Sequence, residues 1–249
     1  MISVATGATT SAKHAAQAAV RYAGARSVYT IEAPLAAAIG AGLPIAETAG
    51  VLIVDIGGGM TEIAALALGG SVVARTLPVA GDTLDAAIQQ FVRDRYDLLI
   101  SEQMAEDAKL IAGSAYPLDE ERTVMLRGRD VRTGFPRAVE VSSVELRAAT
   151  DAPVGEIVAA IRDVLEETPP ELLTDIWEHG MVLTGGGALL RGLPQRLNAE
   201  TRIAARVARN PTCAVLRGLV QMVDTLDDPA YRPMLELNRA ARSVRQSAP

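Results

Sequence analysis

Cysteine is almost absent from this chain of 249 residues, and its scarcity limits the chemistry that the chain can use. Cys213 is the only cysteine, so no internal disulfide can form and a reducing compartment is expected. The apolar neighbours of Cys213 predict a buried structural thiol rather than a nucleophile. His14 and His179 lack the spacing of metal ligands, which argues against a zinc site.

Net positive charge and long apolar runs are missing as well. The formal net charge of -6 argues against nucleic-acid binding, because contacts to phosphates need a basic surface. No run reaches the roughly 18 apolar residues that cross a bilayer, and the first residues show no secretory signal. Aromatic residues make up 3% against 49% hydrophobic residues, so the core must consist of Ala, Val, Leu and Ile. These limits indicate an acidic, cytoplasmic globular protein.

Strands and helices are predicted to alternate along most of the chain, which is typical of an α/β fold. Gly69-Gly70 separates two apolar stretches, 62–68 and 71–77, and predicts a β-hairpin. A charged, β-like stretch at 117–142, carried on a helix at 101–113, indicates a small inserted subdomain. The other predicted strands are 2–6, 28–32, 51–55 and 180–187, and the other predicted helices are 11–24, 33–42, 81–96, 143–168 and 189–201.

Three consecutive glycines follow a buried strand twice, in IVDIGGGMTE and in VLTGGGALLR. Glycine permits close approach of the backbone, so the amide groups of such a loop can bind an anion. One loop alone would fit a tight turn equally well, whereas two in matching contexts favour phosphate binding. We expect one loop from each half of the molecule, facing each other across a polyphosphate. Asp55, at the end of its strand, would hold a water of a hydrated Mg²⁺.

Other phosphate-binding and catalytic motifs are not found. No glycine is followed by lysine, which excludes a Walker loop, and both glycine runs fail the G-x-G-x-x-G pattern. The nucleophile elbow G-x-S-x-G does not occur. Asp82 either caps the predicted helix 81–96 or marks an anion site at its free N–H groups. Glu106 and Lys109 lie one helical turn apart, either as a ligand-binding pair or as a solvated ion pair.

Several long blocks closely resemble the bacterial actin family of the rod-shape-determining MreB type. They run from about residue 4 to about residue 226 and read IEAPLAAAIGAGLP, VDIGGGMTEIA, GDTLDAAI, AGSAYP, RGRDVRTGFPR, PPELLTDIWEHGMVLTGGGALLRGL and NPTCAV. The resemblance implies the α/β actin-like ATPase fold, shared with sugar kinases and heat-shock chaperones, with two similar halves around a nucleotide cleft. It also implies ATP and Mg²⁺ as cofactors and protofilaments under the cytoplasmic membrane that organise the cell-wall elongation machinery.

The resemblance assigns nucleotide contacts to twelve residues and a water-mediated magnesium contact to Asp55. The twelve are Gly57, Gly58, Gly59, Thr61, Gly81, Asp82, Glu106, Lys109, Gly185, Gly186, Gly187 and Ala188.

The family pattern also predicts a division into domains. The family opens with a D-x-G-T phosphate loop that this sequence lacks, so the first half-domain is expected to be incomplete. Residues 1–50 would be its remnant (subdomain IA), and 51–226 the second half (IIA) with returning C-terminal elements. About 98–142 would form the small insert (IIB), and 227–249 a polar flexible tail. Since the family's membrane-contacting segments lie largely in the missing part, any membrane contact is expected to be indirect.

Two positions depart from the family's catalytic pattern. Ala33 replaces the glutamate that polarises the attacking water, and Met60 replaces a threonine that places it. Loss of a general base costs about 100- to 10,000-fold in rate. Glu32 is expected to point elsewhere, because side chains on a strand alternate between faces. We therefore predict weak or absent ATP hydrolysis and no confident catalytic residue.

Three functions follow from these patterns. The first is a cytoskeletal, shape-determining scaffold that associates with itself or with a full-length MreB-type paralogue, in the cytoplasm and at the inner face of the membrane. The second is a competent ATPase or small-molecule kinase of the same superfold. The third is a truncated gene product without a role of its own.

Overall fold

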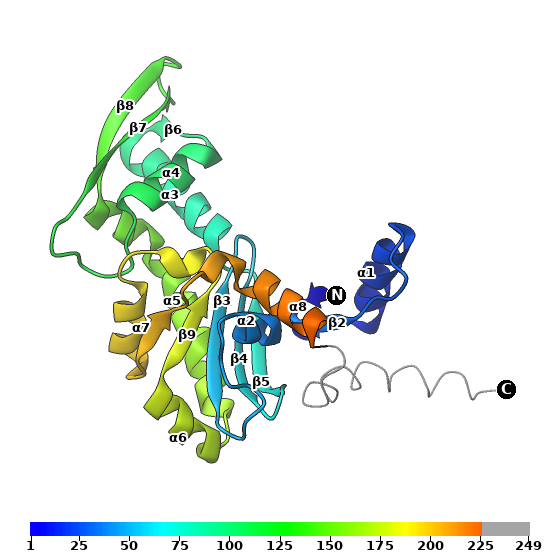
Figure 1. The fold of residues 1–249 in the computed structure, drawn as a ribbon. Helices are drawn as coiled ribbons and strands as arrows, with labels where there is room; N and C mark the ends of the chain where they lie inside the picture. Colours follow the sequence, from blue (N-terminus) through cyan, green and yellow to red (C-terminus); the bar gives the residue numbers. More distant parts are fainter. Residues whose placement is uncertain (226–249) are drawn as a thin grey trace.

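The computed structural model describes residues 1–225, in which helices and strands alternate along the chain (Figure 1). The strands are β1 (Ile2–Val4), β2 (Thr30–Glu32), β3 (Val51–Ile56), β4 (Thr61–Ala67), β5 (Gly70–Leu77), β6 (Leu98–Leu99), β7 (Thr123–Asp130), β8 (Pro136–Ser142), β9 (Met181–Thr184) and β10 (Ala205–Val207). The α-helices are α1 (Thr10–Tyr22), α2 (Ala33–Gly40), α3 (Gly81–Tyr96), α4 (Glu102–Ala112), α5 (Ser143–Glu167), α6 (Pro170–His179), α7 (Leu193–Thr201) and α8 (Ala214–Asp224), and the 3₁₀ turns are η1 (Gly187–Leu189) and η2 (Pro211–Cys213).

A five-stranded sheet in the order β10-β9-β3-β4-β5 forms the centre of the molecule. Its strands β10, β9 and β3 run parallel, while β3, β4 and β5 are antiparallel and include the predicted hairpin. Alternate residues of β3 enter two different apolar clusters, since side chains on a strand alternate between faces. Leu52 and Val54 pack with α5 and α7, and Ile53 packs with α2 and α8.

Helices α2 and α8 cross at backbone contact, although they lie far apart in the sequence (Figure 1). A Cβ atom on Gly40 would lie 1.9 Å from the carbonyl oxygen of Ala214, and one on Gly218 would lie 1.8 Å from that of Ala36. Side chains larger than hydrogen are therefore excluded at both glycines. This crossing holds the C-terminal end of the described chain against its N-terminal part.

A smaller body, formed by the sheet β6-β7-β8 and helix α4, stands apart from the central sheet (Figure 1). Its apolar cluster takes Ile88 and Val92 from α3 and Leu146 from α5, so both helices belong to two clusters. The sheet covers the range 98–142 that we expected for an insert, and the division of the chain into domains stays a prediction. The predicted tail, 227–249, lies outside the described residues.

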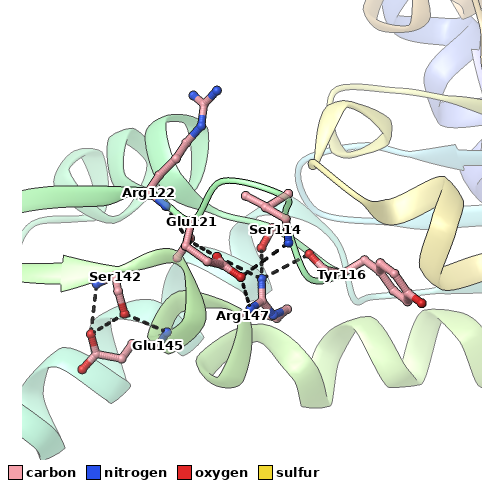
Figure 2. A network of polar contacts seen from close by, with 9 residues as sticks. Ser114, Tyr116, Glu121, Arg122, Ser142, Glu145 and Arg147 are labelled. Carbon is pink, nitrogen blue, oxygen red and sulfur yellow. Dashed lines mark hydrogen bonds and ion pairs between the residues drawn. The ribbon is translucent and has the colours of Figure 1, made fainter.

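A polar network joins this smaller body to α5 (Figure 2). The guanidinium of Arg147 donates to the Ser114 hydroxyl at 2.8 Å and to the Tyr116 carbonyl at 3.1 Å, and pairs with Glu121 at 2.7 Å. Hydrogen bonds from Arg147 and then Ser143 lower the pKa of Glu121 to about 2. The network thereby fixes the segment between α4 and β7.

Two local predictions are wrong. Cys213 is exposed, because the buried stripe of α8 consists of Ala214, Gly218 and Met222, and Cys213 precedes that stripe. The helix expected over 189–201 begins only at Leu193, since the residue before it, Gly192, has φ of +72° and interrupts the helix.

Candidate functional site

The two glycine loops lie side by side at one edge of the central sheet. They follow β3 and β9, which are neighbouring parallel strands with Asp55 opposite Thr184. The expectation that each loop belongs to its own half and that the two face each other is therefore wrong. Parallel neighbours end at the same edge of a sheet, and this edge of an α/β sheet is a common place for ligands.

The first loop, residues 57–59, binds the start of α3 through its carbonyl groups. Gly57 accepts from the Gly81 amide at 3.1 Å, and Gly58 accepts from the Asp82 amide at 2.9 Å. The N-cap of α3 is Ala80, so Asp82 is not the cap, and these first-turn amides are not free for an anion. Gly58 is exposed, so its backbone is accessible to a ligand.

The second loop, residues 185–187, is held by packing against β3. Gly185 has φ of +80°, and a Cβ there would lie 2.1 Å from the Ile56 carbonyl oxygen. A Cβ on Gly187 would lie 2.3 Å from Cγ2 of Ile56, whereas one on Gly186 would meet nothing within 4 Å. Ala188 is buried at 1% exposure. Only the middle glycine of this loop is sterically free.

Helix α4 provides the opposite wall through Glu106 and Lys109. The Lys109 ammonium donates to the Gly81 carbonyl at 3.0 Å and pairs with Asp85 of α3 at 2.7 Å. Burial raises the pKa of Asp85, and the hydrogen bond from Lys109 opposes this. Lys109 therefore binds the first turns of α3, to which the first loop is hydrogen-bonded. It does not form a solvated surface ion pair.

These elements enclose a cleft of about 580 Å³, within the range of small-molecule sites. Of the residues assigned by resemblance, eight line it: Gly57, Gly58, Gly81, Asp82, Glu106, Lys109, Gly186 and Gly187. The remaining four of the twelve are not among its lining residues: Gly59, Thr61, Gly185 and Ala188. Thr61 is fully buried, and its hydroxyl donates a hydrogen bond to the Val79 carbonyl at 2.6 Å. This hydroxyl therefore stabilises the fold and does not face the cleft.

Asp55 lies at the base of the first loop. It accepts a hydrogen bond from the Thr184 hydroxyl at 2.8 Å, and burial raises its pKa. Glu62 stands opposite on β4 and accepts from the Thr6 amide at 2.7 Å. Within the described part of the chain no three acidic, His or Cys side chains converge on a metal site. Because Mg²⁺ keeps several waters and uses one or two carboxylates, Asp55 suits a water-mediated contact.

The positions of the expected catalytic groups hold side chains that cannot serve as bases. Ala33 begins α2, and Met60 is 46% exposed beside the first loop. Glu32 accepts from the Ser71 hydroxyl at 2.9 Å, so its carboxylate is directed to β5, as its place on the strand predicted.

Sequence reasoning missed several lining residues, namely Leu84, Asp85, Leu110, Leu189, Leu190, Arg191 and Thr212. Asp85 could have been found, because it lies four residues after Gly81 and therefore on the same side of the helix. Arg191 carries no such signal. It donates to the Leu110 carbonyl at 2.7 Å and so connects the segment after the second loop to α4.

Comparison with known proteins assigns this chain to a family. The sequence model of the MreB/Mbl protein family matches residues 1–230. The chain belongs to the MreB/Mbl family. It is 46% identical to the cell shape-determining protein MreB of Escherichia coli K12 over 227 residues, which cover 91% of this chain and 65% of that protein. It is 40% identical to the cell shape-determining protein Mbl of Bacillus subtilis over 222 residues, covering 89% of this chain and 67% of Mbl.

Solved structures agree with the MreB/Mbl assignment. MreB5 of Spiroplasma citri bound to AMPPNP superposes with a TM-score of 0.89 at 32% identity, over 93% of this chain and 69% of MreB5. A MamK double helical filament gives a TM-score of 0.75 at 23% identity, over 90% of this chain and 67% of that one, and shows the fold alone. The predicted family and actin-like α/β fold are confirmed.

The chain spans 65% of the length of the E. coli relative. Among residues 1–225, no helix combines the length and apolar character needed to cross a bilayer.

Proposed function

We propose that this chain is an actin-like cytoskeletal protein of cell-shape determination that binds an adenine nucleotide, ATP or ADP, in the cleft. The observation that carries the proposal is the convergence of three separate elements on one cavity. These are the first loop, the free glycine of the second loop and the Glu106–Lys109 wall. The likeness to MreB5, which was solved with AMPPNP, supports the ligand class. The cell-shape names of the MreB and Mbl relatives support the role.

Eleven of the twelve predicted nucleotide contacts, all except Gly59, divide into two groups under this proposal. The eight lining residues would contact the ligand, with exposed backbone at Gly58 beside the phosphates. Thr61, Gly185 and Ala188 would instead hold the loops in place, since they are buried or packed against Ile56. Asp55 would hold Mg²⁺ through water, and Mg²⁺ would neutralise charge on the phosphates.

Binding without useful hydrolysis is the second part of the proposal. Ala33 has no group that accepts a proton, and the Met60 thioether is only a weak acceptor. The role would therefore be that of a scaffold or modulator that associates with itself or a full-length MreB-type paralogue. We place it in the cytoplasm, at the inner face of the membrane through partners of the cell-wall elongation machinery, and divide it into subdomains as the family pattern predicts.

Isothermal titration with Mg²⁺ and ADP tests the binding site. The unchanged chain should bind, and Gly58→Glu should abolish the heat signal, because the new side chain would enter the cleft beside Asp82. Gly155→Glu is the matched control, since a Cβ on this α5 glycine meets nothing within 4 Å. Absence of binding by the unchanged chain, or equal binding by Gly58→Glu, contradicts the proposal.

Phosphate release from ATP tests the second part. The unchanged chain should turn over at least about 100-fold more slowly than the double variant Ala33→Glu/Met60→Thr, because the variant regains a base and a water-placing hydroxyl. Rapid, magnesium-dependent turnover by the unchanged chain would instead make it a competent ATPase.

A further inference from the structure

Asp85 is a buried acid in the cleft wall whose role neither the family resemblance nor the packing explains. It is 5% exposed and lies one turn after Gly81 on α3. Its Oδ2 is 2.7 Å from the Lys109 ammonium, and its Oδ1 has no hydrogen-bond partner among the described residues. A buried carboxylate with an unpaired oxygen costs stability, and replacing a buried ion pair with apolar residues is often neutral or stabilising. The pair is thus poorly explained as a stabilising device.

The contacts of Lys109 indicate a role for Asp85. A lysine ammonium has three N–H donors on a long flexible side chain. Two of the donors are taken by α3, at the Gly81 carbonyl and at Asp85. The third remains for a ligand in the cleft that Lys109 lines. Asp85 therefore converts a mobile cation into one with a fixed position.

The neighbouring acids do not fill this role. Glu106 and Asp82 also line the cleft, but both are exposed. Asp85 alone among the three is buried, and the hydrogen-bond geometry joins it directly to the lysine. A charge interaction in a buried setting is screened less than one at the surface.

We propose that Asp85 is a positioning residue for nucleotide binding. It holds Lys109 so that the remaining donor of the ammonium, beside Glu106, meets the nucleoside part of the ligand. The same contact links α4 to the first turn of α3, and the Gly81 amide carries the link to Gly57 of the first loop. This inference rests on the proposed function, because it names how one residue of that site acts.

The composition of the chain allows a direct test of Lys109. Lys13 and Lys109 are the only lysines in the sequence. Lys13 lies on α1, half-exposed and without an ion pair within residues 1–225, and serves as an internal reference. Acylation by an amine-reactive ester, followed by mass spectrometry, should modify Lys109 more slowly than Lys13. Asp85→Asn should speed modification of Lys109 about tenfold and leave Lys13 unchanged, because the ion pair that holds the Lys109 side chain against α3 is lost.

Asp151→Asn is the matched control for this experiment. It makes the same chemical change at an exposed ion pair, 2.9 Å from Arg196, and neither residue lines the cleft. It should leave the modification rates of both lysines unchanged. An unchanged Lys109 rate in Asp85→Asn overturns the positioning role.

Titration with Mg²⁺ and ADP measures the consequence for binding. Asp85→Asn should raise Kd about tenfold, and Lys109→Gln should do the same. The double variant should bind no more weakly than Lys109→Gln alone, because residues that act through one another are not additive. The double variant also removes both charges, so it avoids the unpaired buried charge that could unfold a single variant. A double variant whose losses add overturns the inference.

The two proposals fail in different ways. If the unchanged chain binds no nucleotide while Asp85→Asn still releases Lys109, the proposed function is overturned and the positioning of Lys109 is supported. If nucleotide binds with equal affinity to the unchanged chain and to Asp85→Asn, the proposed function stands and the role of Asp85 is overturned.

Discussion

The two triple-glycine loops look alike in the sequence and differ in structure. In the loop 185–187, Gly185 has positive φ, and any Cβ on Gly185 or Gly187 would collide with Ile56. In the loop 57–59 no glycine has positive φ, and the nearest approach to a Cβ is 3.2 Å, from the Asp82 carboxylate to Gly58. The second loop needs glycine for packing, whereas the first could hold small side chains without backbone collision.

This difference in packing shows that the same triple-glycine pattern can have two different causes. Glycine weakens a chain by its conformational entropy, so three in succession need a cause. For 185–187 the cause is the close contact of a neighbouring strand. For 57–59 the steric reason is weaker, since the nearest backbone atom to a Cβ would be the Met60 carbonyl oxygen, 3.3 Å from Gly57, and the exposure of this loop needs another explanation. Ligand binding therefore explains the first loop better than the second.

Substitution of Gly185 should have the largest effect. Gly185→Ala forces a non-glycine residue into positive φ and places Cβ 2.1 Å from the Ile56 carbonyl oxygen. We expect a loss of about 2–4 kcal/mol in the free energy of unfolding, measured by urea denaturation. Gly186→Ala, where a Cβ meets nothing within 4 Å, should cost less than about 1 kcal/mol. Equal losses in the two variants would remove the distinction between the loops.

Amide hydrogen exchange should separate the loops by their response to nucleotide. The Gly185 amide already donates to the Pro211 carbonyl at 2.9 Å, so ligand should change its exchange little. Gly58 and Gly59 are exposed, and we expect exchange in this segment to slow about tenfold with Mg²⁺ and ADP. Stronger protection at 185–187 than at 57–59 would reverse the assignment.

The pH dependence of stability should report on the contact between Asp55 of β3 and Thr184 of β9, and this effect should be the smallest. Burial raises the pKa of Asp55, so the folded chain holds this proton more tightly than the unfolded chain. The contribution of Asp55 to stability should then fall as pH rises from about 4 through the raised pKa, and stay constant above it. Asp55→Asn should remove this fall and raise stability at pH 7 by less than about 1 kcal/mol, read from urea denaturation across pH. A steeper fall in the variant would contradict this sign.

Local patterns predicted most elements but not their neighbours. The apolar run before Asp55 and the glycine pair at 69–70 predicted β3 and the β4–β5 hairpin, because period and turn residues are local signals. The pairing of β3 with β9 joins residues more than a hundred positions apart, and neither strand carries a mark of its partner. The loops were therefore assigned to opposite halves when they share one edge.

Within the site, exposure to a ligand was harder to predict than residue type. The sequence at the start of α3 predicted free amide groups. Two of them donate to the carbonyl groups of Gly57 and Gly58. No local sequence pattern predicts this packing of a loop against a helix. Thr61 matches the family pattern, but its hydroxyl serves the Val79 carbonyl. The spacing of Asp85 from Gly81 indicated its side of the helix, but only the structure shows that Lys109 lies beside it.

Helix α5 has a mechanical consequence for the cleft. It contributes Leu146 to the apolar cluster of the smaller body and Val154 to that of the central sheet, and Pro153 lies between them. Proline has no N–H to donate to the carbonyl four residues earlier, so the helix resists bending least at this point. A bend at Pro153 would move the smaller body relative to the central sheet, and α3, which also joins the two clusters, would have to bend with it. Because α4 belongs to the smaller body and lines the cleft, such a bend would change the width of the cleft.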